Sequence, residues 1–187
     1  MDKNKKKLLL HSCCGPCSTT AIFSLAEEYD ITICYYNPNI YPEEEYIKRK
    51  NEQVKLIKAI NEEGNIKIDL LDVEYDSERF EEAVCSLQKE KEGGARCSVC
   101  FRLRLEKVAM LAKEQSFDLF ATTLTVSPHK NAPLINSIGE QISKEINVPY
   151  LPTDLKKKDG YKKSIEYSKQ YELYRQNYCG CKYSIWW

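Results

Sequence analysis

Short apolar runs alternate with amphipathic segments along almost the whole chain, and this alternation restricts the possible fold more than any other feature. The runs consist mostly of β-branched, leucine and aromatic residues, which predicts strands at 7–11, 31–36, 66–73, 117–125 and 148–151. Between them, apolar residues recur at helical spacing, which predicts helices over 43–63, 77–91, 99–113 and 131–146. Strands separated by helices form parallel βαβ units with right-handed crossovers. We therefore expect an α/β fold.

The order of these segments predicts a single Rossmann-like (HUP-like), doubly wound domain with a mainly parallel sheet. A chain of 187 residues suits one domain, and neither a repeat nor a linker divides it. We expect residues 1–187 to form this domain. Within it, residues 155–187 are expected as a C-terminal helical extension that is rich in basic and aromatic residues and carries a Cys-Gly-Cys motif.

Charge and apolar content exclude some classes of protein. Because 28 Lys+Arg balance 28 Asp+Glu, a uniformly basic nucleic-acid-binding surface is excluded, although a local basic patch is not. No apolar run approaches the ~20 residues that span a bilayer, so we expect a cytoplasmic protein with no membrane partner. Structural disulfides are rare in the cytoplasm. The nine cysteines therefore indicate metal or redox chemistry.

Seven of the nine cysteines fall in three short motifs. The first motif, Cys13-Cys14-Gly-Pro-Cys17, follows the first expected strand, and α/β sheets bind ligands at the carboxyl ends of their strands. Pro16 suits the first turn of a helix, whose N-terminus favours the thiolate forms that bind metals. The second motif is Cys97-Ser-Val-Cys100, which opens an expected helix. The third is Cys179-Gly-Cys181.

The spacing of the motifs leaves the kind of centre open. Two separated Cys-x-x-Cys pairs can form a structural zinc site, but such pairs usually lie about 12–20 residues apart. Here about eighty residues separate Cys17 from Cys97, and an iron–sulfur cluster is compatible with such dispersed thiolates. The spacing alone favours cluster and zinc equally. Thioredoxin-like exchange through Cys14 and Cys17 is less favoured, because an adjacent Cys13 is not part of that motif.

The remaining cysteines are interpreted separately. Thiols separated by one residue, as in Cys179-Gly-Cys181, close only a small and strained disulfide ring, and strained, accessible disulfides tend to be catalytic or regulatory. The same pair could instead complete a metal site or be inert. Cys34 and Cys85 stand in apolar surroundings outside the motifs, and we expect both to pack in the core.

A few further polar residues are candidates for the site. Asp72 and Asp76 end the third expected strand, where a carboxylate reaches a metal or delivers protons, although helix capping is the commoner role of such an acid. We expect His11 to be a packed strand end. His129 is expected in a loop that faces the site.

Aromatic and basic residues are concentrated near the C-terminus. Four tyrosines recur at helical spacing, which is typical of a stripe packed against a core: Tyr167, Tyr171, Tyr174 and Tyr178. Interleaved basic and aromatic residues also suit phosphate contacts and base stacking in RNA binding. The candidate phosphate contacts are Arg102, Arg104, Lys156–Lys158 and Lys162–Lys163.

The three cysteine motifs, in this order, resemble those of the QueH family of epoxyqueuosine reductases. The similar segments are Leu8–Ser18, Tyr36–Pro42, Gly93–Arg102 and Tyr178–Ser184. Each Cys-x-x-Cys is common by itself, but the ordered trio is specific, and the resemblance spans nearly the whole chain. It implies an oxidoreductase that reduces the epoxide of epoxyqueuosine in the anticodon loop of tRNA to queuosine, with an external electron donor.

The resemblance also implies roles for the cysteines. A [4Fe–4S] cluster would be held by four of them, namely Cys13, Cys14, Cys97 and Cys100. Cys179 and Cys181 would form a redox-active pair. The resemblance further implies one additional mononuclear iron close to the cluster, with Cys17, also a candidate catalytic residue, and an acid such as Asp72 or Asp76 as candidate ligands.

The chemistry of the implied reaction agrees with these residues. Converting an epoxide to an alkene releases the oxygen as water and consumes two electrons and two protons. Since a [4Fe–4S] centre normally passes one electron at a time, a second carrier is required, such as the Cys179–Cys181 dithiol or a neighbouring iron. Two alternatives stay open: a zinc-stabilised tRNA-binding module, and a thiol–disulfide oxidoreductase that acts on proteins.

Overall fold

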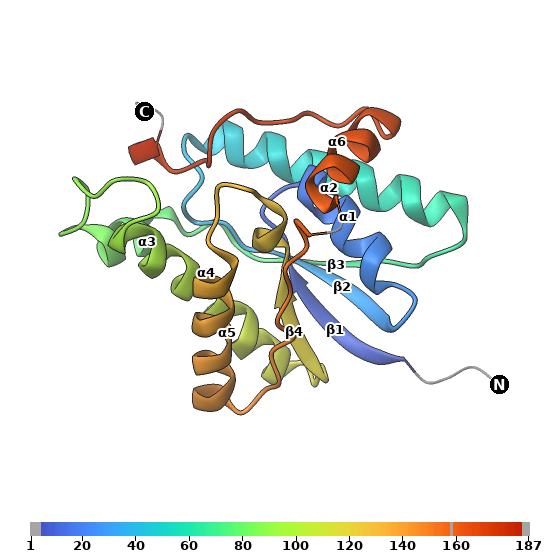
Figure 1. The fold of residues 1–187 in the computed structure, drawn as a ribbon, viewed down its shortest axis with the longest axis horizontal. Helices are drawn as coiled ribbons and strands as arrows, with labels where there is room; N and C mark the ends of the chain where they lie inside the picture. The colour runs from blue at the N-terminus through green and yellow to red at the C-terminus, as the bar shows by residue number, and fades with distance from the viewer. Residues whose placement is uncertain (1–4, 158, 185–187) are drawn as a thin grey trace.

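The computed structural model describes residues 5–157 and 159–184. A helix follows each strand along the chain (Figure 1). In order they are β1 (Lys6–His11), α1 (Gly15–Leu25), β2 (Tyr29–Tyr35), α2 (Glu43–Glu63), β3 (Asp69–Asp72), α3 (Ser77–Val84), α4 (Ala95–Glu114), β4 (Leu119–Thr122), the 3₁₀ helix η1 (Thr123–Val126), α5 (Ala132–Ile146), α6 (Gly160–Gln170) and the 3₁₀ helix η2 (Lys182–Ser184).

The sheet has four parallel strands in the order β3-β2-β1-β4. The chain winds outward from β1 to β3 on one side and returns to place β4 on the other side of β1. The strand order therefore reverses between β1 and β4, and their carboxyl ends form the switch point at which such sheets bind ligands. In the register, His11 at the end of β1 lies beside Cys34 on one side and Thr122 on the other.

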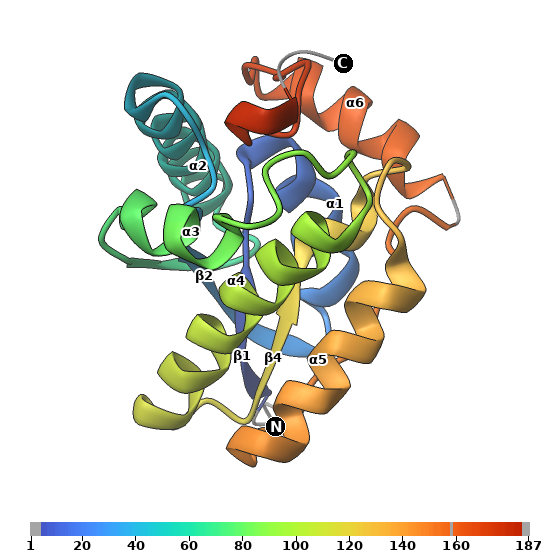
Figure 2. The ribbon, with the colours of Figure 1, turned by 90° about the vertical axis from the view of Figure 1, so that its left-hand side faces the viewer.

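Helices cover both faces of the sheet because side chains along a strand alternate in direction. Leu8 and Leu10 of β1 pack with the apolar side chains of α1 and α2, whereas Leu9 packs on the opposite face against α4 and α5. Figure 2 shows α4 and α5 side by side on their face. The predicted α/β class, with Rossmann-like winding and a helix in the C-terminal extension, is confirmed.

Several predicted elements differ from those in the structure. The segment 148–151 was expected to be a strand but forms one bridge, between Phe120 and Tyr150, because Pro149 has no N–H to donate to a ladder. The helix expected over 77–91 ends at Val84. The strands expected over 66–73 and 117–125 are shorter, and the second continues as η1.

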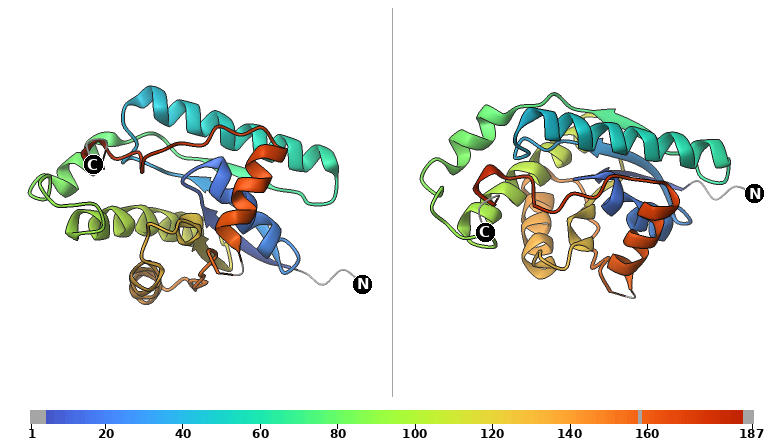
Figure 3. Two further views of the ribbon diagram at one scale, coloured as in Figure 1. Left: turned by 45° about the horizontal axis from the view of Figure 1, so that its top comes forward. Right: turned by 90° about the horizontal axis from the view of Figure 1, so that it is seen from above.

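The segment after α6 returns across the molecule. Helix α6 packs on α1, and the rings of Tyr167 and Tyr171 lie against Phe23. Figure 3 shows residues 171–184 running beside α2 towards α3 and the start of α4. This path brings the Cys-Gly-Cys motif to the carboxyl edge of the sheet. Within the described residues, no helix has the length and apolar character that a membrane span requires.

Candidate metal centre

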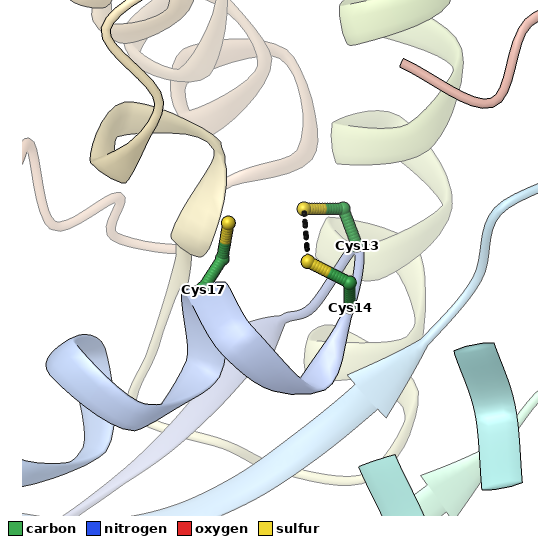
Figure 4. Close-up of side chains that lie close together, drawn as sticks. All are labelled: Cys13, Cys14 and Cys17. Carbon is green, nitrogen blue, oxygen red and sulfur yellow. Dashed lines mark hydrogen bonds between the residues drawn. The ribbon is translucent and has the colours of Figure 1, made fainter. Parts of the chain in front are cut away.

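Three thiols meet in the turn between β1 and α1. The sulfur atoms of Cys13, Cys14 and Cys17 all lie within 4.8 Å of one another (Figure 4). Cys14 precedes the helix in an extended conformation, and Pro16 occupies its first turn, where a missing N–H costs nothing. Among the described residues this is the one group of His, Cys, Asp and Glu side chains with such spacing. The group is a candidate metal site, because cysteine sulfur atoms are ligands that soft metal ions prefer.

The three thiols have different proton affinities. The side-chain interactions that link Cys13 to Cys14 and Cys17 hold the pKa of Cys13 well below the ordinary value. The interaction with Cys13 raises the pKa of Cys14 to about 11, and it raises the pKa of Cys17 as well. Within this group, Cys13 is therefore the thiol that most readily becomes a thiolate.

Buried polar side chains form hydrogen bonds with residues of the β1–α1 turn. The hydroxyls of Ser12 and Ser18 both donate to the side-chain oxygen of Gln53 on α2, at 2.6 and 2.7 Å. From the segment after α6, the amide nitrogen of Gln176 donates to the Cys14 sulfur at 3.0 Å. The turn is therefore held by two parts of the chain that are distant from it in sequence.

The other four thiols of the motifs line one pocket. Cys97 and Cys100 come from the first two turns of α4, and Cys179 and Cys181 come from the segment after α6. Burial raises the pKa of Cys100 to about 12 and that of Cys181 to about 11. The N–H of Gly93 donates to the Cys97 sulfur at 3.2 Å, an interaction that stabilises a thiolate or a metal-bound sulfur there.

Comparisons with known proteins identify the family. The chain is 42% identical over 185 residues to epoxyqueuosine reductase QueH of Staphylococcus epidermidis, which covers 98% of this chain and 78% of that protein. It is 41% identical over 180 residues to the protein of the same name from Streptococcus pyogenes. This match covers 96% of this chain and 71% of that protein. The family model described as epoxyqueuosine reductase QueH matches residues 8–186. The chain belongs to the QueH family.

As a QueH-family member, the chain is an oxidoreductase. Its fold is shared more widely. A solved structure, described as that of a predicted subunit of tRNA methyltransferase from Methanocaldococcus jannaschii, superposes with a TM-score of 0.50 at 15% identity. The match covers 88% of this chain and 74% of the other. At this identity the likeness shows the fold alone.

The two candidate acids of this QueH-family chain have other partners. Asp72 pairs with Lys50 at 2.6 Å, and Asp76 accepts the backbone N–H of Arg79 as the N-cap of α3. Neither carboxylate joins the group formed by Cys13, Cys14 and Cys17 among the described residues.

The histidines and the two isolated cysteines divide between core and surface. His11 is fully buried, and burial lowers its pKa to about 4. Its neutral ring donates from Nε2 to the carbonyl of Tyr36, which confirms the expected packed strand end. His129 is exposed on the pocket wall. Cys34 is buried as expected, but the expectation for Cys85 is wrong, because α3 ends at the residue before it and leaves it exposed.

The basic residues proposed as phosphate contacts differ in their exposure and in their partners. Arg102 pairs with Glu145 on the surface. Arg104, a candidate phosphate contact, is 2% exposed and lines the pocket that contains Cys97 and Cys100. The exposed Lys162 and Lys163 lie on α6. The side chain of Lys156 donates to the carbonyl of residue 130, and Lys158 lies outside the described residues.

Three residues of the site were not found from the sequence. Gln53 and Gln176 act through tertiary contacts, and an isolated glutamine carries no motif. Lys130 lines the pocket that contains Cys97, Cys100, Cys179 and Cys181. Its position next to His129, in the loop between η1 and α5, was the available signal.

Proposed function

We propose that this chain reduces the epoxide of epoxyqueuosine, in the anticodon loop of tRNA, to the alkene of queuosine with an iron–sulfur cluster and redox-active cysteines. Membership of the QueH family supports the reaction. The observation that carries the proposed chemistry is the group of Cys13, Cys14 and Cys17 at the carboxyl end of β1. It presents sulfur ligands at the edge of the sheet where α/β proteins bind ligands.

The donor set suits an iron–sulfur cluster, since thiolates are the ligands that hold such clusters. When bound, the cluster would supply electrons one at a time. Its proposed ligands come from the β1–α1 turn and the start of α4: Cys13, Cys14, Cys97 and Cys100. The Gly93 N–H at the Cys97 sulfur and the Gln176 amide at the Cys14 sulfur orient two of these ligands.

The ligands of an additional mononuclear iron are supported unequally. Cys17 belongs to the same group as Cys13 and Cys14, which supports it as a ligand. Asp72 and Asp76 are held by Lys50 and by the first turn of α3. Either acid would have to leave its present partner to bind iron, so Cys17 is the better supported of the three.

Cys179 and Cys181 complete the proposed electron balance. Oxidation of a dithiol to a disulfide forms one S–S bond and releases two electrons and two protons. The epoxide consumes the same number when its two C–O bonds break and its oxygen leaves as water. Gly180 has a φ of 107°, which glycine adopts readily, and it lets the chain turn between the two thiols. An external donor would then reduce the disulfide.

Residues around the pocket suit an RNA substrate. Bases in an anticodon loop are unpaired, so extending one into a pocket costs little. His129 is exposed on the pocket wall, where we place it in contact with the base or its phosphate. The exposed Lys162 and Lys163 on α6 are the proposed contacts to more distant phosphates, which is consistent with a chain of zero net charge.

The test is anaerobic purification followed by turnover. We expect brown protein that contains iron and acid-labile sulfide, and formation of queuosine from tRNA that carries epoxyqueuosine when a strong reductant is supplied. Nucleoside analysis measures the product. Cys100→Ser should abolish iron binding and turnover, whereas the matched control Cys85→Ser, which changes an exposed thiol, should retain both.

Other outcomes would support the alternatives. Colourless protein with stoichiometric zinc and no product would indicate a zinc-stabilised tRNA-binding module. Full turnover by Cys179→Ser and Cys181→Ser would contradict the electron-carrying role of this pair. Reduction of protein disulfides without action on the tRNA would indicate a thiol–disulfide oxidoreductase.

A further inference from the structure

Two cations that lie beside the thiols have no carboxylate partner in the part of the chain that the structure describes. Arg104 on α4 is 2% exposed, and its Nη2 has no hydrogen-bond partner among these residues. Lys130, in the loop before α5, lines the pocket that contains Cys179 and Cys181. Within residues 5–157 and 159–184, neither side chain forms an ion pair. A desolvated cation without a counter-charge is strongly unfavourable, so another group must supply negative charge.

The thiols supply that charge when they bind a metal as thiolates. Arg104 and Lys130 line the same pocket as Cys97 and Cys100, and the Arg104 Nε donates to the Cys100 carbonyl at 3.2 Å. Burial by itself lowers the pKa of Arg104, but negative charge on Cys100, Cys179 and Cys13 raises it above the ordinary value. Lys130 behaves in the same way: burial lowers its pKa, and Cys179, Cys13 and Cys17 more than reverse that effect. Each cation is therefore influenced by the charge of cysteines from more than one motif. Both line the pocket that contains Cys97, Cys100, Cys179 and Cys181.

Two other charged residues of the pocket, Arg96 and Glu92, have different roles. The guanidinium of Arg96 donates to the backbone carbonyls of Leu87, Gln88 and Glu90, so its role is to hold the loop before α4. Glu92 also lines the pocket, but its side chain is exposed. Among the described residues, it forms no ion pair with Arg104 or Lys130.

We propose that Arg104 and Lys130 are the counter-charges of the metal–thiolate centre and raise its reduction potential. This inference rests on the proposed function, because it requires the thiols to hold a redox-active cluster. A cluster held by four thiolates is anionic overall, and each added electron makes it more negative. A nearby cation therefore stabilises the reduced form more than the oxidised form. Arg104 and Lys130 would affect the reaction only through the potential of the metal–thiolate centre, so they are positioning residues and not catalytic residues.

The test compares reduction potentials of the reconstituted full-length protein. Anaerobic titration with dithionite, a one-electron donor, is followed by visible absorbance and electron paramagnetic resonance. For Lys130→Gln and Arg104→Gln, we expect the ratio of reduced to oxidised centre at a fixed potential to fall at least tenfold, which is 59 mV for a one-electron couple. Lys130→Arg and Arg104→Lys keep the charge and should retain the wild-type potential.

A matched control removes a positive charge from the same helix at a distance. Lys113 is exposed in the last turn of α4, about 20 Å along the helix from Cys100 at a rise of about 1.5 Å per residue. That distance exceeds the Debye length of about 8–10 Å, so Lys113→Gln should leave the potential unchanged. If Arg104→Gln does not fold, Lys130→Gln decides the question, because Lys130 lies in the loop before α5 and not within a helix.

The results separate this inference from the function on which it rests. Iron-loaded Lys130→Gln with an unchanged potential would overturn the inference alone. The same result together with weakened tRNA binding would assign the cation to RNA phosphates, which also overturns it. A wild-type protein that holds no iron–sulfur cluster would overturn the proposed function and this inference with it.

Discussion

Cys14, one of the proposed metal ligands, is contacted by a side chain that is distant from it in sequence. Its sulfur lies 3.8 Å from that of Cys13 and accepts a hydrogen bond from the Gln176 amide at 3.0 Å. The amide oxygen of Gln176, Oε1, is buried and has no hydrogen-bond partner among the described residues. The amide is therefore held by its contact with the sulfur, at the cost of an unsatisfied oxygen.

This contact predicts the behaviour of Gln176→Leu. Partners that orient metal ligands typically contribute about ten- to hundredfold in metal affinity. We expect the variant to lose iron to a chelator correspondingly more readily, as measured by the iron-to-protein ratio over time. Gln170→Leu, which changes an exposed glutamine at the end of α6, is the control. Equal retention by both variants would show that the hydrogen bond does not support the centre.

Helix α2 connects the first and third cysteine motifs. Gln53 on its inner face binds Ser12 and Ser18 beside the first motif. One turn away, Arg49 donates to the carbonyls of Tyr178 and Cys179 at 3.4 and 3.1 Å. Gly15 also lies close to this helix, and a Cβ there would stand 3.1 Å from the Glu52 carbonyl oxygen. The glycine of the first motif is thus explained by close packing against α2.

The role of α2 predicts the effect of Arg49→Met. Methionine retains much of the apolar stem but cannot donate to the two carbonyls, and a hydrogen bond from a charged group contributes about 1.5–3 kcal/mol. We expect the segment that carries Cys179 to open more easily. The Tyr41 N–H, which donates to the Gly180 carbonyl at 2.8 Å, should then exchange with solvent at least tenfold faster.

Amide hydrogen exchange followed by NMR measures this effect at Tyr41. Lys58→Met is the control, because Lys58 is exposed on the same helix and lies 3.9 Å from its partner Glu62. Wild-type exchange at Tyr41 in Arg49→Met would mean that other contacts hold the segment.

Elements with strong local signals were predicted well, and those decided by tertiary contacts were not. The apolar spacing over 43–63 predicted α2 with its observed bounds. The helix expected over 77–91 ends at Val84. The Arg96 guanidinium donates to the carbonyls of Leu87 and Gln88, which would otherwise accept hydrogen bonds within a longer helix. The sequence pattern of 77–91 does not predict this contact, because Arg96 belongs to the next helix, α4.

At the scale of the whole molecule, the three cysteine motifs converge at one edge of the sheet. The position of the first motif followed from the strand that precedes it, since β1 ends at the switch point. The grouping of Cys97 and Cys100 with Cys179 and Cys181 was not predictable from spacing. It depends on the path of residues 171–184 beside α2, which hydrogen bonds such as that from the Tyr174 N–H to Glu52 determine.

This convergence predicts how metal removal affects stability. The proposed cluster would join the β1–α1 turn to the start of α4 and would therefore bind only the folded chain. Binding at a ligand concentration a hundredfold above the dissociation constant contributes about 2.7 kcal/mol to stability. We expect anaerobic removal of iron to lower the thermal unfolding midpoint. Amide exchange should increase around Cys13, Cys97 and Gln176, while Leu9 and Phe120 in the buried sheet keep their protection. An unchanged midpoint, or a uniform increase in exchange, would contradict a centre that joins these segments.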